Sequence, residues 1–207
     1  MTAEVAELET PHGTARVHLY GTESMPAATL VLGHGASGGP EAPDLVAARE
    51  AARSEGIAVV LVEQPYRVAG RRAPPRAPQL DAAWVSVVEQ LAARELTGAR
   101  LIAGGRSLGA RVACRTADGT GAVAVLCLAF PLEPPSRGGK PRQSRLAELD
   151  AVQVPTLVVQ GERDPFGLPP PARLREVVAV AGDHGLKADV GAVAAAIQRW
   201  LREMVSA

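Results

Sequence analysis

The sequence predicts an α/β fold: a mostly parallel, twisted sheet with helices on both faces and an antiparallel hairpin near the N-terminus. Short apolar runs alternate with segments of helical periodicity along the chain, and glycine or proline separates most of them. Strands joined by single helices form right-handed crossovers and therefore lie parallel. The 207 residues, 47% of them hydrophobic, suit a single domain over residues 1–207.

The first part of the chain contains a hairpin, two buried strands and a helix. The expected strands cover residues 5–8, 15–20, 28–32 and 57–62, and the expected helix covers residues 43–54. Pro11, His12 and Gly13 form the hairpin turn between the first two strands. The third strand is a continuous apolar run, as expected for a strand that is buried on both faces. Gly56 is placed where the helix should stop.

The remaining part continues the same alternation of strand and helix. The expected strands cover residues 100–103, 122–129, 156–160 and 176–180. The expected helices cover residues 79–95, 108 to about 116, 145–149 and 188–204. Only about a dozen residues connect the strand 122–129 to the next helix, too few for a helical cap domain.

The charge and composition exclude several classes of function. The 22 basic and 22 acidic residues give zero net charge, whereas proteins that neutralise nucleic-acid phosphates carry a basic excess. The longest apolar run, residues 121–132, is too short to span a membrane. The acidic start of the chain does not resemble a secretory signal, so we expect a cytoplasmic protein. Cys114 and Cys127 lack metal-site spacing and are expected to be buried thiols.

One short motif indicates a nucleophile. Residues 105–109 read Gly-Arg-Ser-Leu-Gly, which matches G-x-S-x-G and lies between a predicted strand and a predicted helix. A sharp turn there would hold Ser107 in a strained conformation, and the flanking glycines would remove Cβ atoms that clash across it. The alternative is a glycine-rich turn with an incidental serine. We expect Ser107 to be a catalytic nucleophile.

A serine hydroxyl needs a base, and His184 is the best candidate. The four histidines are His12, His18, His34 and His184. Only His184 directly follows the last predicted strand, and sites in open parallel sheets collect beyond the carboxyl ends of the strands. An acid must then orient the imidazole.

Asp164 is the expected orienting acid, because it lies in the loop after the strand 156–160 and further from the strand end than Glu162. Asp183 precedes His184, but adjacent residues of an extended segment point in opposite directions. The resulting order of Ser107, Asp164 and His184 is that of the α/β-hydrolase triad. The alternatives are a plain loop histidine and a turn-capping aspartate.

The glycine-rich segment 33–39 follows the strand 28–32 and has two interpretations. In a hydrolase, this loop would supply the Ala36 N–H to an oxyanion hole, and the second N–H would come from Leu108. The segment also satisfies G-x-G-x-x-G, with Glu63 further along, as in dinucleotide-binding proteins. Two preceding strands and the delayed helix after Pro40 disfavour that alternative. His34 is expected to fix the loop through a ring hydrogen bond.

Two loops rich in proline and arginine follow strands and should lie at the edge of the site. They cover residues 64–78 and 131–142 and carry Arg67, Arg71, Arg72, Arg76, Arg137, Lys140 and Arg142. Tyr66 and Arg67 are the candidate substrate-rim residues. The cations could attract an acidic substrate or a protein partner, but a solvated rim is the favoured interpretation.

Several segments together carry a resemblance to a known family. They read GHGASGG, PYR followed by GRR, GGRSLGARVA, FPLEPP with a later GKP, PTLVVQGERDPFG and GDHGLK. In this order they resemble the dienelactone-hydrolase-like branch of the α/β-hydrolase superfamily, from about residue 28 onwards. This branch includes a testis-expressed protein and a noncatalytic subunit of a histone acetyltransferase complex.

The resemblance implies the α/β-hydrolase fold, with Ser107, Asp164 and His184 in the triad positions. Two departures qualify it: dienelactone hydrolases proper use cysteine where this chain has Ser107, and some relatives serve as binding modules. We therefore expect a serine hydrolase that forms an acyl-enzyme, with no cofactor and no metal. The missing cap and the 3% aromatic content favour a small ester or thioester as substrate. The alternative is a noncatalytic protein-binding module.

Overall fold

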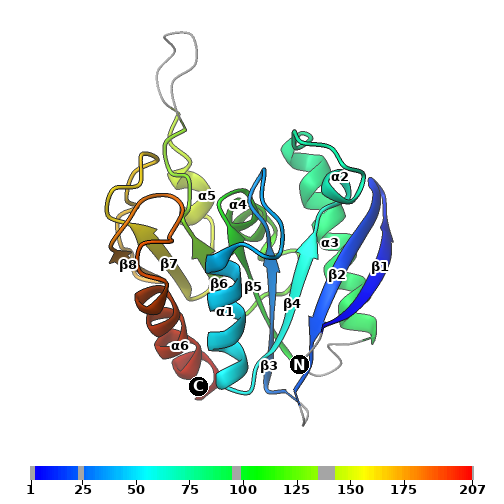
Figure 1. The fold of residues 1–207 in the computed structure, drawn as a ribbon, viewed down its shortest axis with the longest axis horizontal. Helices are drawn as coiled ribbons and strands as arrows, with labels where there is room; N and C mark the ends of the chain where they lie inside the picture. Colours follow the sequence, from blue (N-terminus) through cyan, green and yellow to red (C-terminus); the bar gives the residue numbers. More distant parts are fainter. Residues whose placement is uncertain (1–2, 23–25, 95–98, 135–142, 207) are drawn as a thin grey trace.

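The computed structural model describes residues 3–22, 26–94, 99–134 and 143–206. Its strands are β1 (Glu4–Thr10), β2 (Gly13–Tyr20), β3 (Ala28–Gly33), β4 (Ala58–Glu63), β5 (Arg100–Arg106), β6 (Ala124–Leu128), β7 (Thr156–Gly161) and β8 (Arg175–Val180). They form one sheet in the order β1-β2-β4-β3-β5-β6-β7-β8 (Figure 1). All neighbours from β4 to β8 pair in parallel, and β1 and β2 form the predicted antiparallel hairpin at one edge. The predicted fold class is confirmed.

Six helices are found in the described residues. They are α1 (Pro43–Ser54), α2 (Pro65–Val68), α3 (Ala77–Arg94), α4 (Leu108–Thr116), α5 (Leu146–Asp150) and α6 (Val190–Ser206). The α1 bounds are those that the sequence predicts. Gly56, at a φ of 70°, ends this helix, because its N–H and that of Ile57 bond back to the carbonyls of Arg53 and Ala52. The short α2 lies in the proline-rich loop, where the sequence predicted no helix.

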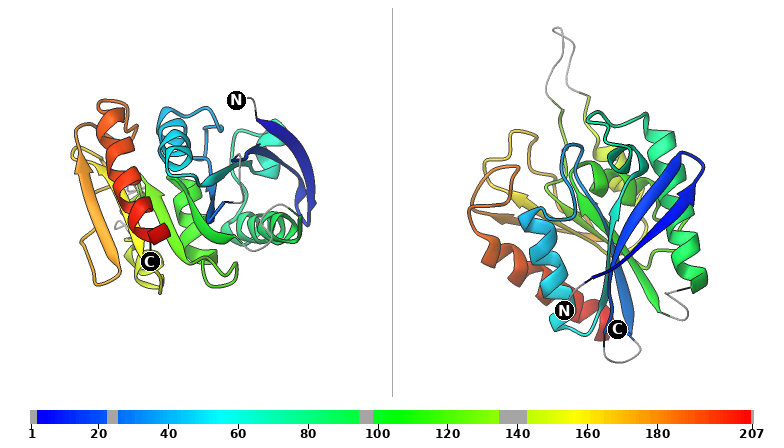
Figure 2. Two further views of the ribbon diagram at one scale, coloured as in Figure 1. Left: turned by 90° about the horizontal axis from the view of Figure 1, so that it is seen from below. Right: turned by 45° about the vertical axis from the view of Figure 1, so that its right-hand side comes forward.

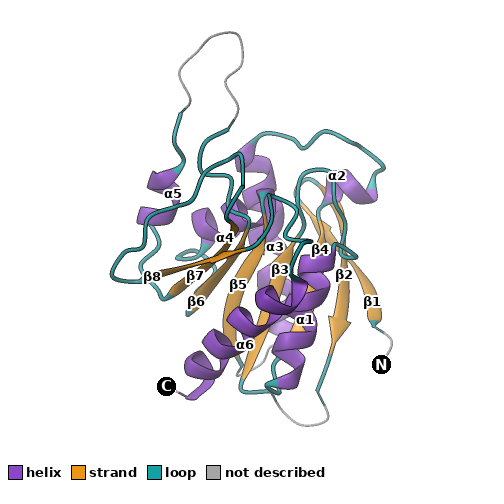
Figure 3. Ribbon diagram, turned by 60° about the vertical axis from the view of Figure 1, so that its left-hand side comes forward, coloured by secondary structure: helices purple, strands orange, loops and turns teal. Residues whose placement is uncertain are grey.

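Helices cover both faces of the sheet. Helices α1 and α6 pack against each other on one face, whereas α3 and α4 lie together on the other face (Figures 2 and 3). Each face has its own buried apolar cluster. Side chains alternate along the central strand β3, so Val31 packs under α3 and α4 while Leu30 and Leu32 pack under α1. This explains why every residue of the strand is buried.

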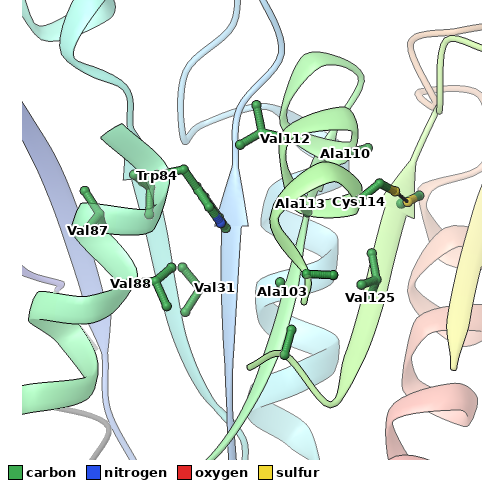
Figure 4. Packing of buried hydrophobic residues seen from close by; sticks show 14 of the residues in the cluster. Val31, Trp84, Val87, Val88, Ala103, Ala110, Val112, Ala113, Cys114 and Val125 are labelled. Carbon is green, nitrogen blue, oxygen red and sulfur yellow. Dashed lines mark hydrogen bonds between the residues drawn. The ribbon is translucent and has the colours of Figure 1, made fainter. Parts of the chain in front are cut away.

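Trp84 of α3 is the largest buried side chain on the α3 and α4 face (Figure 4). It lies close to Gly33, where an added Cβ would sit 3.2 Å from the indole ring. Cys114 of α4 and Cys127 of β6 are buried in the same cluster, with their sulfurs 3.5 Å apart. Both cysteines are core residues, as the sequence predicts.

The carboxyl ends of the parallel strands all meet at one edge of the sheet, and the loops with candidate site residues leave from that edge (Figure 1). Residues 129–145 connect β6 to α5, and part of this connection, 135–142, lies outside the described residues. In the described part of the chain, no large cap domain covers this edge.

Candidate active site

Ser107 occupies a strained turn between β5 and α4. Its φ of 51° and ψ of −102° lie in a region that side-chain-bearing residues seldom adopt. The turn is tight because β3 passes very close: a Cβ at Gly109 would lie 2.3 Å from the Gly33 carbonyl oxygen, and one at Gly105 would lie 2.6 Å from it. The two glycines of the motif are therefore required by backbone approach, as the sequence analysis expected.

The structure brings three predicted residues into one hydrogen-bonded chain. His184 Nε2 lies 3.0 Å from Ser107 Oγ, and His184 Nδ1 lies 2.8 Å from Asp164 Oδ2. The Asp164 carboxylate is completely buried, whereas 21% of the His184 side chain is exposed. Such a chain joins a hydroxyl, a base and an orienting carboxylate in the geometry that activates a serine.

Loop packing explains why Asp164 and not Asp183 contacts the imidazole. The end of β7 packs against the segment that follows β8, since a Cβ at Gly161 would lie 2.4 Å from the Asp183 carbonyl oxygen. This contact places the Asp164 loop directly beside His184. Asp183 turns away and accepts a hydrogen bond from the Gly185 N–H through Oδ1, at 2.9 Å. Glu162 is exposed to solvent.

Two residues that contact the hydrogen-bonded side chains of Ser107, His184 and Asp164 were not predicted from the sequence. Gln160, fully buried on β7, donates through Nε2 to Asp164 Oδ2 at 2.8 Å and to the Phe130 carbonyl at 3.0 Å. The Phe166 ring lies 4.4 Å from the His184 ring, and the Phe166 N–H donates to Asp164 Oδ1 at 2.9 Å. The signal for Gln160 was its polar side chain directly after the apolar run 157–159, four positions before Asp164.

The glycine-rich loop after β3 lies beside Ser107. A Cβ at Gly35 would be 3.7 Å from Ser107 Cβ. His34 is buried and holds this loop: its Nε2 accepts from the Gln64 N–H at 3.1 Å, and its Nδ1 lies 2.7 Å from the Gly35 carbonyl oxygen. The Nδ1–H tautomer satisfies both contacts. Burial lowers the pKa of His34, which favours this neutral form.

The two expected oxyanion donors belong to segments that flank Ser107. Leu108 follows Ser107 at the start of α4, and Ala36 follows Gly35 in the glycine-rich loop. Neither backbone N–H donates a hydrogen bond to another described residue.

Tyr66 and Arg67, the candidate rim residues, lie in α2. Tyr66 is buried rather than at an open rim, and its hydroxyl donates to the Ala36 carbonyl oxygen at 2.7 Å. Burial raises the pKa of Tyr66 to about 12, so the phenol stays protonated as this donor. Arg67 is half-buried, and its Nη1 donates to the Arg71 carbonyl oxygen at 3.4 Å. Tyr66 and Arg71 also line a cavity of about 450 Å³ between the hairpin tip, α2 and α3.

Glu63 and the arginine-rich loops have no hydrogen bond in the described residues to Ser107, His184 or Asp164. Glu63, the acidic residue of the dinucleotide alternative, is 2.7 Å from His18 Nε2 of the hairpin. Arg71, Arg72 and Arg76 are exposed, as a solvated rim would be. Arg137, Lys140 and Arg142 fall outside the described residues.

The described part of the chain contains neither a cluster of metal ligands nor a membrane-spanning helix. No three His, Cys, Asp or Glu side chains there are grouped so that they could hold a metal ion. None of the described helices has the length and apolar character needed to cross a bilayer.

Comparison with solved structures gives extensive matches. XC6422 from Xanthomonas campestris, described as an α/β serine hydrolase without lid, superimposes with a TM-score of 0.80 at 19% identity, covering 100% of this chain and 97% of that chain. Est1E from Butyrivibrio proteoclasticus matches with a TM-score of 0.78 at 15% identity, covering 100% of both chains. A serine hydrolase homologue from Coxiella burnetii matches with a TM-score of 0.76 at 15% identity, covering 97% of this chain and 98% of that chain.

These structural matches show a shared fold, and no curated protein matches the chain in sequence. The sequence nevertheless matches one family model, the alpha/beta hydrolase domain, over residues 26–196. That stretch runs from the start of β3 into α6 and includes Ser107, Asp164 and His184. The chain belongs to the alpha/beta hydrolase domain family.

Proposed function

We propose that this protein is a serine hydrolase that cleaves a small ester or thioester through an acyl-enzyme. The observation that carries the proposal is the continuous hydrogen-bonded chain from Ser107 Oγ through His184 to the buried Asp164 carboxylate. Membership of the hydrolase family and the fold shared with serine hydrolases and esterases support it. The roles of these residues are assigned from the hydrogen-bonded geometry, and not from sequence identity to the solved hydrolases or from motif spacing alone.

In the first step, Ser107 Oγ attacks the acyl carbonyl carbon while His184 Nε2 accepts the hydroxyl proton. Asp164 accepts a hydrogen bond from His184 Nδ1–H, which keeps Nε2 free as the base and stabilises the imidazolium that forms. The imidazolium then protonates the leaving alcohol or thiol. Water, deprotonated by His184, attacks the acyl-enzyme and regenerates the Ser107 hydroxyl with release of the acid.

The oxyanion of each tetrahedral intermediate would accept hydrogen bonds from the Ala36 and Leu108 N–H groups. Both belong to segments beside Ser107, and neither has another acceptor among the described residues. Preorganised N–H donors of this kind contribute several kcal/mol to transition-state stabilisation, about 3 kcal/mol for one donor. Tyr66 supports this arrangement, because its hydroxyl binds the carbonyl oxygen of Ala36.

The proposed substrate is small because no large cap domain covers the strand ends in the described residues. We expect kcat/KM for activated esters to be highest with acetyl or butyryl groups and to fall with octanoyl groups, since a shallow site offers little apolar wall to a long chain. Steady-state hydrolysis of a p-nitrophenyl ester series measures this. A preference for the octanoyl ester would contradict the shallow-site proposal without affecting the nucleophile assignment.

Labelling with a fluorophosphonate probe tests the nucleophile. The native protein should take up the probe, and Ser107→Ala should take up none and lose at least roughly a thousandfold in esterase activity. Ser86→Ala is the matched control, because Ser86 lies on α3 away from the site and its hydroxyl accepts a hydrogen bond from Gln90 Nε2 at 3.3 Å. Unlabelled native protein, or equal labelling of Ser107→Ala, would refute the mechanism and favour the noncatalytic protein-binding alternative.

We also propose that the chain lies in the dienelactone-hydrolase-like branch, with serine in place of cysteine as nucleophile. The expectations of one domain over residues 1–207, a cytoplasmic location, no cofactor and no nucleic-acid partner stand as predictions. The alternative to a solvated rim is that the arginine-rich loops bind a protein partner. Binding there would be weakened by salt, since salt screens interactions between solvent-exposed charges.

A further inference from the structure

Arg106, the residue directly before Ser107, contacts three segments of the site with one guanidinium group. Its Nη2 donates to the His184 carbonyl oxygen at 3.0 Å, and its Nε lies 2.9 Å from Asp44 Oδ2 at the start of α1. Its Nη1 packs against the glycine-rich loop, where a Cβ on Gly35 would come within 2.8 Å of that nitrogen. Arg106 therefore links the loops after β3 and β8 to the strand end that carries Ser107.

Asp44 is an unusual partner because its side chain is completely buried. Burial raises the pKa of Asp44, and the Arg106 charge opposes this rise. Its Oδ1 accepts from the Leu45 N–H at 3.0 Å, which fixes the carboxylate at the first turn of α1. A buried carboxylate is costly unless it is paired, so the ion pair holds the Arg106 side chain in one position.

We propose that Arg106 and Asp44 form a positioning pair that sets the distance between the His184 ring and the Ser107 hydroxyl. This inference rests on the serine hydrolase function proposed above. Neither residue touches the reacting atoms. Arg106 instead holds the backbone of His184, while Asp44 aims the guanidinium at that carbonyl oxygen. Small displacements of a base relative to its nucleophile can lower a rate by about a hundredfold.

Substitutions at both positions test the pair. Arg106→Met removes the charge and all three contacts, and Asp44→Asn removes the charge that aims the guanidinium. We expect kcat for an acetyl ester to fall roughly 10- to 100-fold in each variant, with KM changed less than about threefold, because the base and not the binding surface is displaced. Arg106→Lys should recover only part of kcat, since one ammonium cannot contact Asp44 and the His184 carbonyl with the geometry of the guanidinium.

Arg111→Met is the matched control. Arg111 of α4 pairs with Glu148 of α5 and has the same 19% side-chain exposure as Arg106. It should keep its native kcat. The double variant Asp44→Asn with Arg106→Met should be no slower than the slower single variant, because both substitutions remove one shared function. Thermal unfolding identifies variants that are folded at the assay temperature.

A readout that does not depend on turnover separates this inference from the proposed function. Long-range ¹H–¹⁵N spectra of the imidazole rings report the His184 tautomer, which should carry its proton on Nδ1, facing Asp164, in native protein and be a mixture of tautomers in folded Arg106→Met. The positioning role would be overturned if Arg106→Met kept the native kcat or changed KM alone. It would also be overturned if the losses of kcat in the double variant were additive, or if the His184 tautomer in Arg106→Met were unchanged. An inactive native protein with the expected tautomer change would refute the hydrolase proposal alone.

Discussion

Ser107 combines a strained backbone conformation with a side-chain contact to His184. Its positive φ is one of three among non-glycine residues in the described chain, together with Ala129 and Leu186. Residues held in such sparsely populated conformations cost of order 1–3 kcal/mol, and they persist where the surrounding structure fixes them. At Ser107 the fixed conformation directs the hydroxyl towards His184.

Replacing Ser107 with glycine and with alanine separates the strain from the hydroxyl. Both variants lose the contact with His184, but only glycine adopts this conformation without steric cost. We expect Ser107→Gly to be more stable than Ser107→Ala by about 1 kcal/mol, after the larger entropy of glycine in the unfolded chain is subtracted. Urea unfolding of the two variants measures the difference. Equal stabilities would mean that the turn relaxes when the hydroxyl is absent.

Gln160 shows the limit of residue-level prediction. Its position was visible in the sequence as a polar side chain within an apolar strand, but its partners come from segments far apart in the chain. Asp164 lies in the loop that follows β7, whereas Phe130 lies on the connection after β6. Only the parallel pairing of β6 with β7 places those groups together.

At the scale of elements, glycines decide how closely α4 approaches the sheet. Gly109 in the first turn of α4 lies against Gly33 at the end of β3, with no room for a side chain at Gly109. A Cβ at Gly33 would also be tight, at 3.3 Å from the Gly109 Cα. This close approach carries the N-terminus of α4 beneath Ser107. The motif G-x-S-x-G therefore describes a packing requirement as well as a turn.

Gly109→Ala should break this packing. A Cβ would lie 2.3 Å from the Gly33 carbonyl oxygen, and both groups belong to backbone in regular elements that cannot yield easily. We expect a loss of about 2–4 kcal/mol in the free energy of unfolding, measured by urea titration. Gly191→Ala on α6 is the control, because its Cβ would meet only Asp189 Oδ1 at 3.5 Å. It should be neutral or stabilising by up to about 1 kcal/mol, and a loss matching that of Gly109→Ala would contradict the packing argument.

On the scale of the whole molecule, the strand order brings the site together. Ser107 follows β5, the glycine-rich loop follows β3, and the loops with Asp164 and His184 follow β7 and β8. All four strands run parallel, so their carboxyl ends share one edge. Two apolar clusters pack on opposite faces of the sheet that forms this edge.

The pH dependence of unfolding is also a property of the whole molecule, because it sums protonation differences between the folded and unfolded chain. Burial lowers the pKa of His34 below its ordinary value of 6.5, so the unfolded chain binds a proton more readily. This contribution to stability is present above pH 6.5 and is lost as the pH falls through the lower pKa of the folded state. Its slope reaches at most about 1.4 kcal/mol per pH unit.

His34→Gln tests this contribution, since a glutamine amide oxygen can accept from the Gln64 N–H in place of Nε2 but does not titrate. The variant should lose less stability than native protein between pH 7 and pH 5, as measured by urea unfolding. His12→Gln, an exposed residue at the hairpin turn, should keep the native pH dependence. An unchanged slope in His34→Gln would mean that other groups dominate this pH range.

The sequence by itself determined the order of strands and helices, the hairpin and the helix that ends at Gly56, because these follow from local periodicity and turn residues. It also singled out Ser107, Asp164 and His184, since each lies in the segment directly after a predicted strand and Ser107 lies in a G-x-S-x-G motif. Only the tertiary structure decided that these three side chains lie within hydrogen-bond distance, that Tyr66 is buried, and that Gln160 and Arg106 contact them. The physical reason is that strand pairing and backbone approach join segments far apart in sequence, and no local pattern encodes these contacts.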